Sequence, residues 1–484
     1  MTNPGVDLAA LPPLRVVPDA RWRIREALAG AGRRIAVFDD DPTGSQTVHD
    51  VAVVTVFDPE EIAAGLDGPG STCFILTNTR SMDETDAVAL NTRVGRTVFE
   101  LGRRLDAPID VISRSDSTLR GHVIAEVSAL DAVRREVLGR GFDGVLLIPA
   151  FLEAGRFTAG DVHWARVDGE PTPVGETEFA RDATFGFTAS DLREFVAEKS
   201  RGTIAPGQVH SLTLDDIRRG GSQRVAEILA GVTDGAFVVV NAVDYADLDV
   251  VVLGLLEPQV AGKAFLYRTG PSFPQALAGL DPRPPLTASD IWPADRPGGH
   301  GLVVVGSHVG LTSRQVAVAQ ERGGIVEVEL DVPAVADPTR RDAHVAEVTA
   351  RVVDALAGSD VLLFTSRTLL RDTDPAASLD IARQVSTAVI TVVRGAVAGS
   401  ASGSGPAWVV AKGGITSHDV AVRGLGIRRA TVLGQLLPGL VSVFQPVEAL
   451  PEVVGVPYVV FAGNVGDENT LAYVIDLFSG RTAQ

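Results

Sequence analysis

Three consecutive aspartates follow the first apolar stretch of the chain, and carboxylates in that position could do acid–base or metal chemistry. Asp39, Asp40 and Asp41 come directly after RRIAVF and precede the turn sequence Pro-Thr-Gly. Carboxylates at the end of a strand can accept the proton of a hydroxyl group, or hold a divalent cation against phosphate oxygens. The alternative is that an aspartate only caps the turn. Adjacent side chains on a strand point to opposite faces, so not all three carboxylates can point into one site. We favour the functional interpretation, with Asp41 as the carboxylate nearest the turn.

A second group of polar residues follows the apolar run PIDVIS. The sequence RSDSTLRG contains Asp116, Ser117 and Thr118. A guanidinium group presents a planar fork of donors that matches a carboxylate, and a helix amino end attracts anions, so this segment could bind an acidic substrate. The alternative is that Ser117 only caps the next helix. Arginines near other apolar runs could approach the same small acid, which makes four candidates: Arg80, Arg114, Arg120 and Arg156.

Three glycine turns follow apolar runs in the second half of the chain. They are Gly306–Ser307 after GLVVV, Lys412–Ser417 after AWVVA and Gly463–Asp467 after YVVFA. Glycines at such positions allow backbone N–H groups to approach phosphate oxygens closely. Each could instead be a plain strand-to-helix turn. Three of them in one domain would line a common edge and could surround a nucleotide.

Alternating strands and helices must position these motifs. Runs such as RRIAVFDD, CFILTNT and GVLLIPAF alternate with amphipathic stretches, which is typical of strands that cross over through helices. Ligands of an open parallel sheet gather beyond the carboxyl ends of the strands, where the motifs above lie. We therefore predict an α/β fold of two domains, each with a mainly parallel sheet flanked by helices, and a ligand site in the cleft between them.

The length of 484 residues exceeds one typical core, and the stretch 281–300 holds five prolines and a glycine pair. We expect one domain over residues 1–280, a Pro/Gly-rich linker over 281–300 and a second domain over 301–484.

Composition excludes several classes of protein. The formal net charge of −18 argues against nucleic acid or an anionic membrane as a partner, because both reward a basic face. The start lacks a signal-peptide pattern and no later window approaches the length of a membrane span, so we expect a cytoplasmic protein. The single cysteine excludes an internal disulfide.

The one GxGxxG match runs from Gly139 to Gly144 and precedes a predicted strand. A dinucleotide-binding fingerprint must follow a strand, so we reject this match.

Six motifs in this order resemble the four-carbon acid sugar kinase family. They are DDDPTGSQTVHD, RSDSTLRGH, PAF with GR, KGGITSHDVA, VLGQLLPG and FAGNVGDENT, and the resemblance runs from about residue 35 to 475. It implies a substrate-binding domain over residues 1–280 and a nucleotide-binding domain over residues 301–484. Family members of this kind move the ATP γ-phosphate to a hydroxyl group of erythronate, threonate or 3-oxo-tetronate.

The resemblance also implies roles for individual residues. It places Asp40 and Asp41 in the catalytic position. The implied substrate-binding residues are Thr43, Gly44, Arg80, Arg114, Asp116, Ser117, Arg120 and Arg156. The implied ATP-binding residues are Ser307, Lys412, Gly413, Gly414, Ile415, Thr416, Gly463, Asn464 and Gly466. Ile415 stands where the best-known branch of the family has an acid.

The expected activity is therefore an ATP-dependent kinase acting on a small four-carbon sugar acid, with ATP and Mg²⁺ as cofactors. Two alternatives stay open: another nucleotide-dependent enzyme on small hydroxy acids, such as an oxidoreductase, and a ligand-binding homologue without catalysis. The expected partner is a small anionic substrate, with neither nucleic acid nor membrane. A homodimer is the candidate assembly.

Overall fold

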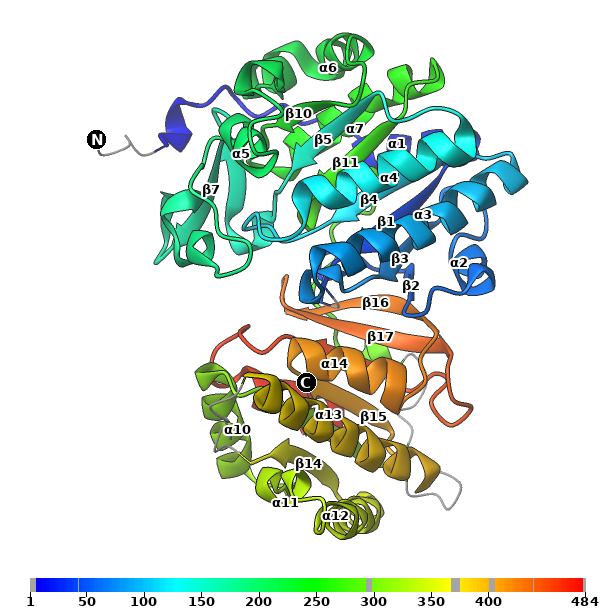
Figure 1. The fold of residues 1–484 in the computed structure, drawn as a ribbon, viewed down its shortest axis with the longest axis vertical. Coiled ribbons are helices and arrows are strands. Elements are labelled where there is room, and N and C mark those ends of the chain that lie inside the picture. The colour runs from blue at the N-terminus through cyan, green and yellow to red at the C-terminus, as the bar shows by residue number, and fades with distance from the viewer. Residues whose placement is uncertain are drawn as a thin grey trace. The chain divides into compact units, whose positions relative to one another are not determined.

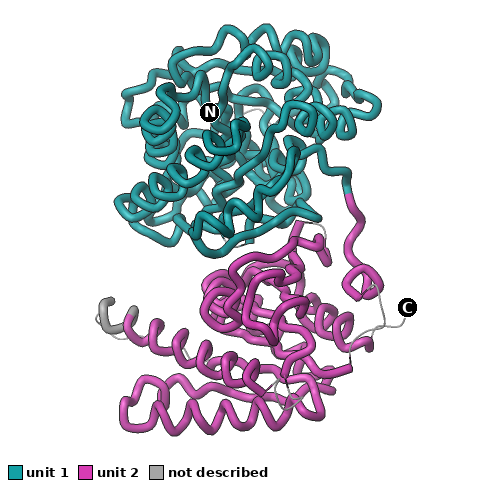
Figure 2. Tube along the Cα trace, turned by 90° about the vertical axis from the view of Figure 1, so that its right-hand side faces the viewer, with its two compact units in different colours: residues 1–282 teal, residues 283–484 magenta. Residues whose placement is uncertain are grey.

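The computed structural model describes residues 6–41, 43–292, 298–366, 375–399, 405–437 and 439–481. The chain divides into two compact units, residues 1–282 and 283–484 (Figure 2). Each unit contains a set of strands flanked by helices and a hydrophobic core.

Unit 1 is built on a parallel sheet. Its strands are β1 Arg34–Asp39, β2 Val51–Val54, β3 Thr72–Leu76, β4 Ile109–Arg114, β5 Gly144–Ile148, β9 His210–Leu212, β10 Ala236–Val240 and β11 Phe265–Thr269. Their order is β2-β3-β1-β4-β11-β5-β10-β9, and all neighbouring pairs are parallel.

Helices join these strands. They are α1 Ala20–Gly30, α2 Pro59–Gly65, α3 Glu84–Leu105, α4 Val123–Leu138, α5 Leu192–Lys199, α6 Gly221–Ala230, α7 Tyr245–Val260 and α8 Ser272–Leu277. In Figure 1, α3 and α4 cross in front of the sheet.

Both faces of the unit 1 sheet are buried. In β1, Ala36 and Phe38 belong to the core cluster that includes residues of α3 and α4, and Ile35 and Val37 on the opposite face are also fully buried. Alternate residues of a strand point to opposite faces, so a strand covered on both sides is a continuous apolar run in the sequence. This explains why apolar runs identify these strands.

A small antiparallel sheet, β6 Arg156–Ala159, β7 Val162–Val167 and β8 Glu170–Pro173, also belongs to unit 1. The sequence analysis does not predict it. Phe157 of β6 and Trp164 of β7 pack with Leu214 in a separate hydrophobic cluster. The sheet matters for the site because its first residue is Arg156.

Unit 2 has a mainly parallel arrangement. Its strands are β12 Gly301–Val305, β13 Ile325–Leu330, β14 Asp360–Thr365, β15 Trp408–Lys412, β16 Arg429–Leu437, β17 Val441–Glu448 and β18 Tyr458–Phe461. In the order β13-β14-β12-β15-β18-β17-β16 the first five strands are parallel, and the last two pairs are antiparallel. The helices are α9 Ala288–Ile291, α10 Gly310–Arg322, α11 Val332–Ala336, α12 Arg341–Leu356, α13 Pro375–Ala398, α14 Gly414–Asp419 and α15 Thr470–Ser479.

Part of the Pro/Gly-rich stretch 281–300 packs on unit 2. Leu286 and Ile291 lie in the core of that unit, and the Leu286 N–H donates to the carbonyl of Gln435 at 2.7 Å. Residues 293–297 of the predicted linker lie outside the described residues.

The α/β class with two mainly parallel, helix-flanked domains is confirmed, and the ligand cleft stays a prediction. The expectation about membrane spans is wrong in one respect. Among the residues that the structure describes, Asp380–Ala398 of α13 has the length and a mean hydropathy of 1.2 that a span requires. This segment is 39% buried, and a core helix passes the same test.

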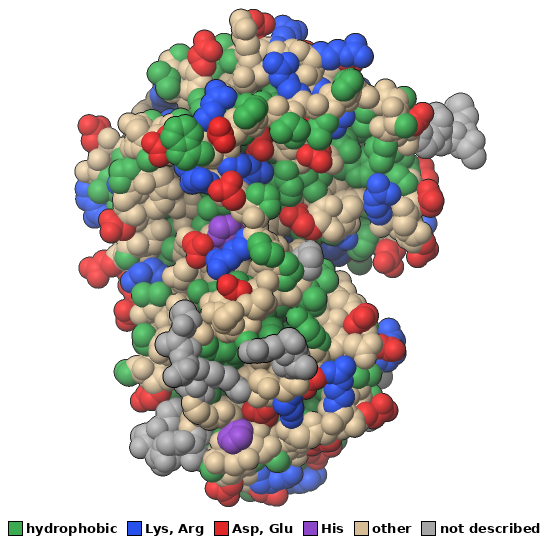
Figure 3. All heavy atoms as spheres, turned by 180° about the vertical axis from the view of Figure 1, so that it is seen from behind, with side chains coloured by type: hydrophobic (Ala, Val, Ile, Leu, Met, Phe, Trp, Pro, Cys, Tyr) green, Lys and Arg blue, Asp and Glu red, His purple; other side chains and the backbone are tan. Residues whose placement is uncertain are grey.

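Charges of both signs are mixed on one face of the molecule. On the face shown in Figure 3, acidic and basic side chains are interspersed, with no large area of one sign.

Candidate active site

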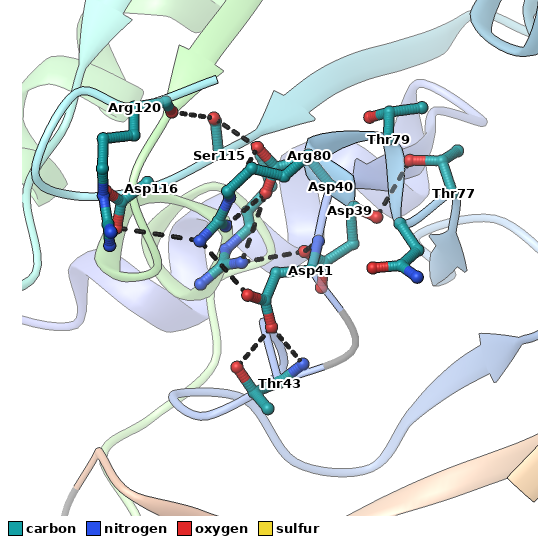
Figure 4. A network of polar contacts seen from close by, with 12 residues as sticks. Asp39, Asp40, Asp41, Thr43, Thr77, Thr79, Arg80, Ser115, Asp116 and Arg120 are labelled. Carbon is teal, nitrogen blue, oxygen red and sulfur yellow. Dashed lines mark hydrogen bonds and ion pairs between the residues drawn. The ribbon is translucent and has the colours of Figure 1, made fainter. Parts of the chain in front are cut away.

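The aspartates at the end of β1 meet arginines at the carboxyl edge of the unit 1 sheet (Figure 4). Asp39 pairs in register with Arg114, the last residue of β4. The Arg114 Nη1 lies 2.9 Å from Asp39 Oδ1, and both side chains are buried. Burial raises the pKa of Asp39 to about 7, although Arg114 lowers it. This buried pair forms the base of the site.

Asp40 is also buried, and two neighbours hold its carboxylate. The Ser115 hydroxyl donates to Asp40 Oδ2 at 2.6 Å, and the Arg80 guanidinium donates to both carboxylate oxygens. The Asp40 side chain is only 2% exposed. The Asp40 carboxylate holds the Arg80 guanidinium in place, so the geometry favours a positioning role for Asp40. The catalytic role of Asp40 stays a prediction.

Asp41 has the most exposed carboxylate of the three, with 28% of its side chain accessible. Its Oδ2 lies 3.1 Å from Arg80 Nη1, and its Oδ1 accepts from the backbone N–H and the hydroxyl of Thr43. Burial raises the pKa of Asp41, but Arg80, Arg114 and these hydrogen bonds outweigh burial and lower it below its usual value. Asp41 is therefore an ionised, oriented and accessible acceptor.

Gly44 and Thr43 shape the turn that carries these aspartates. A Cβ atom added at Gly44 would lie 1.9 Å from Asp39 Oδ2, so only glycine fits there. Thr43 donates to Asp41, as described above. Both residues contact aspartates of the site, and their predicted contact with substrate stays a prediction.

The segment 115–122 is a loop, and the expectation of a helix end at Ser117 is wrong. α4 begins at Val123, with His122 at its N-cap position. Ser117 is buried, and its carbonyl accepts from His163 Nε2 at 2.8 Å. The loop contains Leu119 at φ 68°, a conformation that a bulky residue rarely adopts. Such backbone strain is often found at functional sites.

Asp116 lies within this loop and connects two arginines. Its Oδ2 accepts from Arg120 Nε at 2.7 Å, and its Oδ1 lies 3.9 Å from Arg80 Nη1. The pKa of Asp116 falls well below its usual value because these two guanidinium groups outweigh the effect of burial. Arg80 therefore joins Asp40, Asp41 and Asp116 in one polar network, drawn in Figure 4.

Arg156 differs from the other three candidate arginines. Each of those pairs with an aspartate, whereas within the described part of the chain Arg156 forms no ion pair, and its buried Nε has no hydrogen-bond partner. Its guanidinium lies 5.7 Å from the ring centroids of both Phe151 and Phe179. Burial lowers its pKa. Arg156 is thus a desolvated cation with donors available for an anion.

The sequence analysis missed a buried group behind Asp40. Arg268 in β11 donates to Ser113 Oγ at 2.7 Å and to Ser115 Oγ at 2.8 Å, and it pairs with Glu126 of α4. Ser115 is therefore held between Arg268 and Asp40. The position of Arg268 near the end of the run KAFLYRTG could have revealed it by the same strand-end argument.

The three glycine turns of unit 2 lie against one another, as predicted. A Cβ atom added at Gly306 would lie 2.3 Å from Thr416 Oγ1, and one at Gly463 would lie 2.7 Å from Ser307 Oγ. A Cβ at Gly413 would lie 3.1 Å from Thr416 Oγ1. The turns after β12, β15 and β18 therefore share one edge, and their glycines permit the close approach.

The two glycines after β15 have different environments. Gly413 has φ 119°, whereas a Cβ atom added at Gly414 would meet no atom within 4 Å. Gly414 is the first residue of α14, where backbone N–H groups have no acceptor inside the helix. Ile415 is 72% exposed beside it. This open helix start can receive an anion.

Lys412 points into unit 2. Its side chain is fully buried, its Nζ donates to the carbonyl of Ala462 at 2.8 Å, and it lies 3.7 Å from the Phe461 ring centroid. Burial lowers its pKa to about 7. In this geometry Lys412 holds the turn after β18, and its contact with phosphate stays a prediction.

Two further residues predicted to bind ATP, Asn464 and Gly466, lie in the turn after β18. Gly466 has φ 79°, and an added Cβ would lie 2.4 Å from Thr470 Oγ1. Asn464 is exposed.

A resident metal cage is not formed by the part of the chain that the structure describes, because no three His, Cys, Asp or Glu side chains gather in a suitable group. Mg²⁺ in nucleotide enzymes is commonly held by one or two carboxylates together with phosphate oxygens. The accessible carboxylate of Asp41 fits such a partial role.

Comparison with known proteins finds two family models that match successive parts of the chain. Residues 35–277 match the family model of a sugar-binding N-terminal domain, and residues 302–471 match that of a nucleotide-binding C-terminal domain. The D-erythronate kinase of Heliobacterium modesticaldum is 28% identical over 258 residues. The match spans 51% of this chain and 51% of that protein, so it covers about half the length of the curated relative.

Solved structures share the fold. Haemophilus influenzae protein HI1011 is 18% identical with a TM-score of 0.64, over 92% of this chain and 100% of that one. A protein of Salmonella typhimurium LT2 is 17% identical with a TM-score of 0.67, over 91% and 98%. At these identities the likeness shows the fold alone. The two domain models match in order over most of the sequence, and the chain therefore belongs to the four-carbon acid sugar kinase family.

Proposed function

We propose that the protein is an ATP-dependent kinase that transfers the γ-phosphate to a hydroxyl group of a small four-carbon sugar acid, a tetronate or 3-oxo-tetronate. The relation to a D-erythronate kinase and the two domain models support this activity. The observation that carries the proposal is the network at the unit 1 sheet edge, where an accessible carboxylate and an unpaired arginine lie around Asp116.

The substrate carboxylate binds to Arg156 in this proposal. Its guanidinium has free donors, and its partly desolvated setting strengthens an interaction with an anion. The Phe179 ring centroid lies 5.4 Å from the Arg120 guanidinium and 5.7 Å from that of Arg156. Arg120 is already paired with Asp116, so it contributes to the positive field more than to direct binding.

Asp41 accepts the proton of the attacking hydroxyl group. Its lowered pKa keeps it ionised at neutral pH, and Arg80 and Thr43 fix its orientation. A weak base is sufficient because phosphoryl transfer depends mainly on positioning and charge stabilisation.

The nucleotide binds at the shared edge of the unit 2 turns. The open N–H groups at the start of α14 receive phosphate oxygens, and Gly306, Gly413 and Gly463 keep this edge compact. Bound Mg²⁺ would neutralise part of the charge on the phosphate oxygens. Cytoplasmic location and a homodimer are proposed with this activity.

A coupled ADP-release assay over stereoisomers of tetronate and 3-oxo-tetronate tests the proposal. We expect turnover with at least one four-carbon acid and none with the corresponding neutral polyols, since these lack the carboxylate that Arg156 binds. Absence of ADP release with every acid, combined with a thermal shift by NAD and none by ATP, would replace the kinase with an oxidoreductase.

A further inference from the structure

A second cavity lies at the opposite edge of the unit 1 sheet. It has a volume of about 360 Å³ and is lined by the segments that lead into β1, β4 and β11, together with the ends of α3, α4 and α7. β4 begins at Ile109 beside this cavity and ends at Arg114 in the aspartate site. Five steps along a strand separate the two places by roughly 16 Å. The cavity is therefore distinct from the candidate active site.

Basic residues predominate in this cavity, although the chain has a net charge of −18. Two acidic side chains, Asp106 and Asp110, also line it. The basic ones are Arg33, Arg103, Arg134, Arg140 and Lys263. Like charges gathered in a hollow attract an ion of opposite sign.

Not all of these cations are neutralised by the protein. Arg33 forms a two-point pair with Asp110, at 2.9 and 2.7 Å. Arg134, in contrast, is 9% exposed and donates to the carbonyls of Arg140 and Gly141, with no carboxylate partner among the described residues. Its pKa falls to about 10, chiefly through burial.

Arg103 supplies a further cation from the last turn of α3. Its side chain is exposed, and no ion pair involves it within the described ranges. Arg140 and Lys263 share Asp143, at 3.7 and 3.6 Å. Donors therefore reach the cavity from several separate elements.

The cavity wall also contains an unsatisfied acceptor. Gln259 is 5% exposed, and its Nε2 donates to Asp110 Oδ1 at 3.0 Å. Since a carboxylate only accepts, this bond fixes which end of the amide is nitrogen. The buried Oε1 has no hydrogen-bond partner in the described structure. A buried acceptor without a partner costs free energy, and a ligand hydroxyl group that reached it would remove this cost.

We propose that this cavity binds a small hydroxylated phosphate ester. Separate cations on α3, α4 and the loops around them match the several oxygens of a phosphate group better than the two coplanar oxygens of a carboxylate. Gln259 Oε1 accepts from a hydroxyl group of the same ligand. The volume suits a molecule of about the size of a triose or tetrose phosphate. This site does not depend on the proposed kinase reaction.

Calorimetric titration of the full-length protein tests the site, with inorganic phosphate, glycerol 3-phosphate and glycerol as probes. We expect glycerol 3-phosphate to bind more tightly than inorganic phosphate and glycerol not to bind. Arg103→Ala should weaken glycerol 3-phosphate binding by about fivefold or more, because it removes one charged donor. Arg104→Ala is the matched control, since Arg104 is exposed in the same turn but does not line the cavity.

The outcomes separate this cavity from the active site. Binding of glycerol 3-phosphate that is equal in wild type and Arg103→Ala would place the ligand elsewhere and overturn the proposal, as would the absence of binding. Gln259→Met should abolish the preference for the ester over inorganic phosphate. Equal affinities of the two probes in the wild type would overturn the assignment of a hydroxylated ligand.

Discussion

Valine at Gly414 should remove nucleotide binding while leaving the fold nearly intact, because the two glycines after β15 differ. A side chain at Gly414 would enter open space, and the residue has no positive φ. Gly413 has φ 119°, and its added Cβ would lie 3.1 Å from Thr416 Oγ1. Gly413→Val should therefore lose about 1 to 3 kcal/mol of stability through backbone strain. Gly414→Val should change stability by less than about 1 kcal/mol, since valine is not a poorer helix former than glycine.

The expected loss of ATP affinity follows from the donors at the start of α14. The branched side chain of valine would fill the space in front of the first N–H groups of that helix. A hydrogen bond to a charged group contributes about 1.5 to 3 kcal/mol. Loss of one or two such bonds should weaken ATP binding by about tenfold to 10⁴-fold.

Calorimetry with ATP and urea unfolding on the same preparations measure both effects. The wild type, Gly413→Val and Gly414→Val form the series, with Gly414→Ala as the smallest step. Normal ATP affinity in folded Gly414→Val would refute the phosphate site at this turn, and it would leave the close packing of the three turns as a structural feature only.

Three further changes test unit 1. Asp41→Asn should lower kcat by about 10² to 10⁴ with little change in KM, because a lost proton acceptor acts in the transition state; an active variant would reassign the role. Arg156→Ala should raise KM for the acid substrate by about tenfold or more and leave KM for ATP unchanged in the same assay, whereas equal effects on both would contradict its place in the substrate site. His163 is buried with a pKa of about 4 against 6.5 when unfolded. The unfolded chain therefore binds the proton first as pH falls, and the stability present above pH 6.5 should drop by up to about 3 kcal/mol towards pH 4. The raised pKa of Asp39 changes stability in the opposite direction over the same range, so the two effects must be separated by comparison with His163→Gln. The free energy of unfolding from urea titrations, taken as wild type minus His163→Gln, should fall by about 2 kcal/mol from pH 7 to pH 5, and a difference that does not change with pH would contradict this role of His163.

Most of the fold could be predicted because its strands are buried on both faces. Strands such as β1 and β12 are short apolar runs, and helix-covered parallel strands need this composition. The strands that escaped prediction lack it. β8 reads EPTP with three exposed or half-buried positions and two prolines, and β17 contains Pro446. Proline and exposed positions interrupt the apolar run by which the other strands can be recognised in the sequence.

The site was less predictable than the fold. The strand-end argument found the aspartates and the arginines, but it could not show which of them pair with one another. Ser115 and Arg268 lie behind Asp40 only because β4 and β11 are neighbours in the sheet, and this order is not visible in the sequence. The loop at Ser117 was mistaken for a helix start because Ser-Thr followed by a helical pattern resembles a cap, whereas Gly121 at φ 121° delays the helix to Val123.

The pairing pattern of the arginines explains how one sheet edge can serve both structure and recognition. Every aspartate at the end of β1 is compensated from a neighbouring element: Asp39 by Arg114, and Asp40 and Asp41 by Arg80. A buried charge without a partner costs several kcal/mol, so these pairs are needed before any ligand arrives. Arg156 has no such partner in the described structure, and its half-buried guanidinium lies beside the rings of Phe151 and Phe179. An anionic substrate would supply the negative charge that Arg156 lacks. Part of its binding energy would therefore come from a cation that has no ion-pair partner in the folded protein.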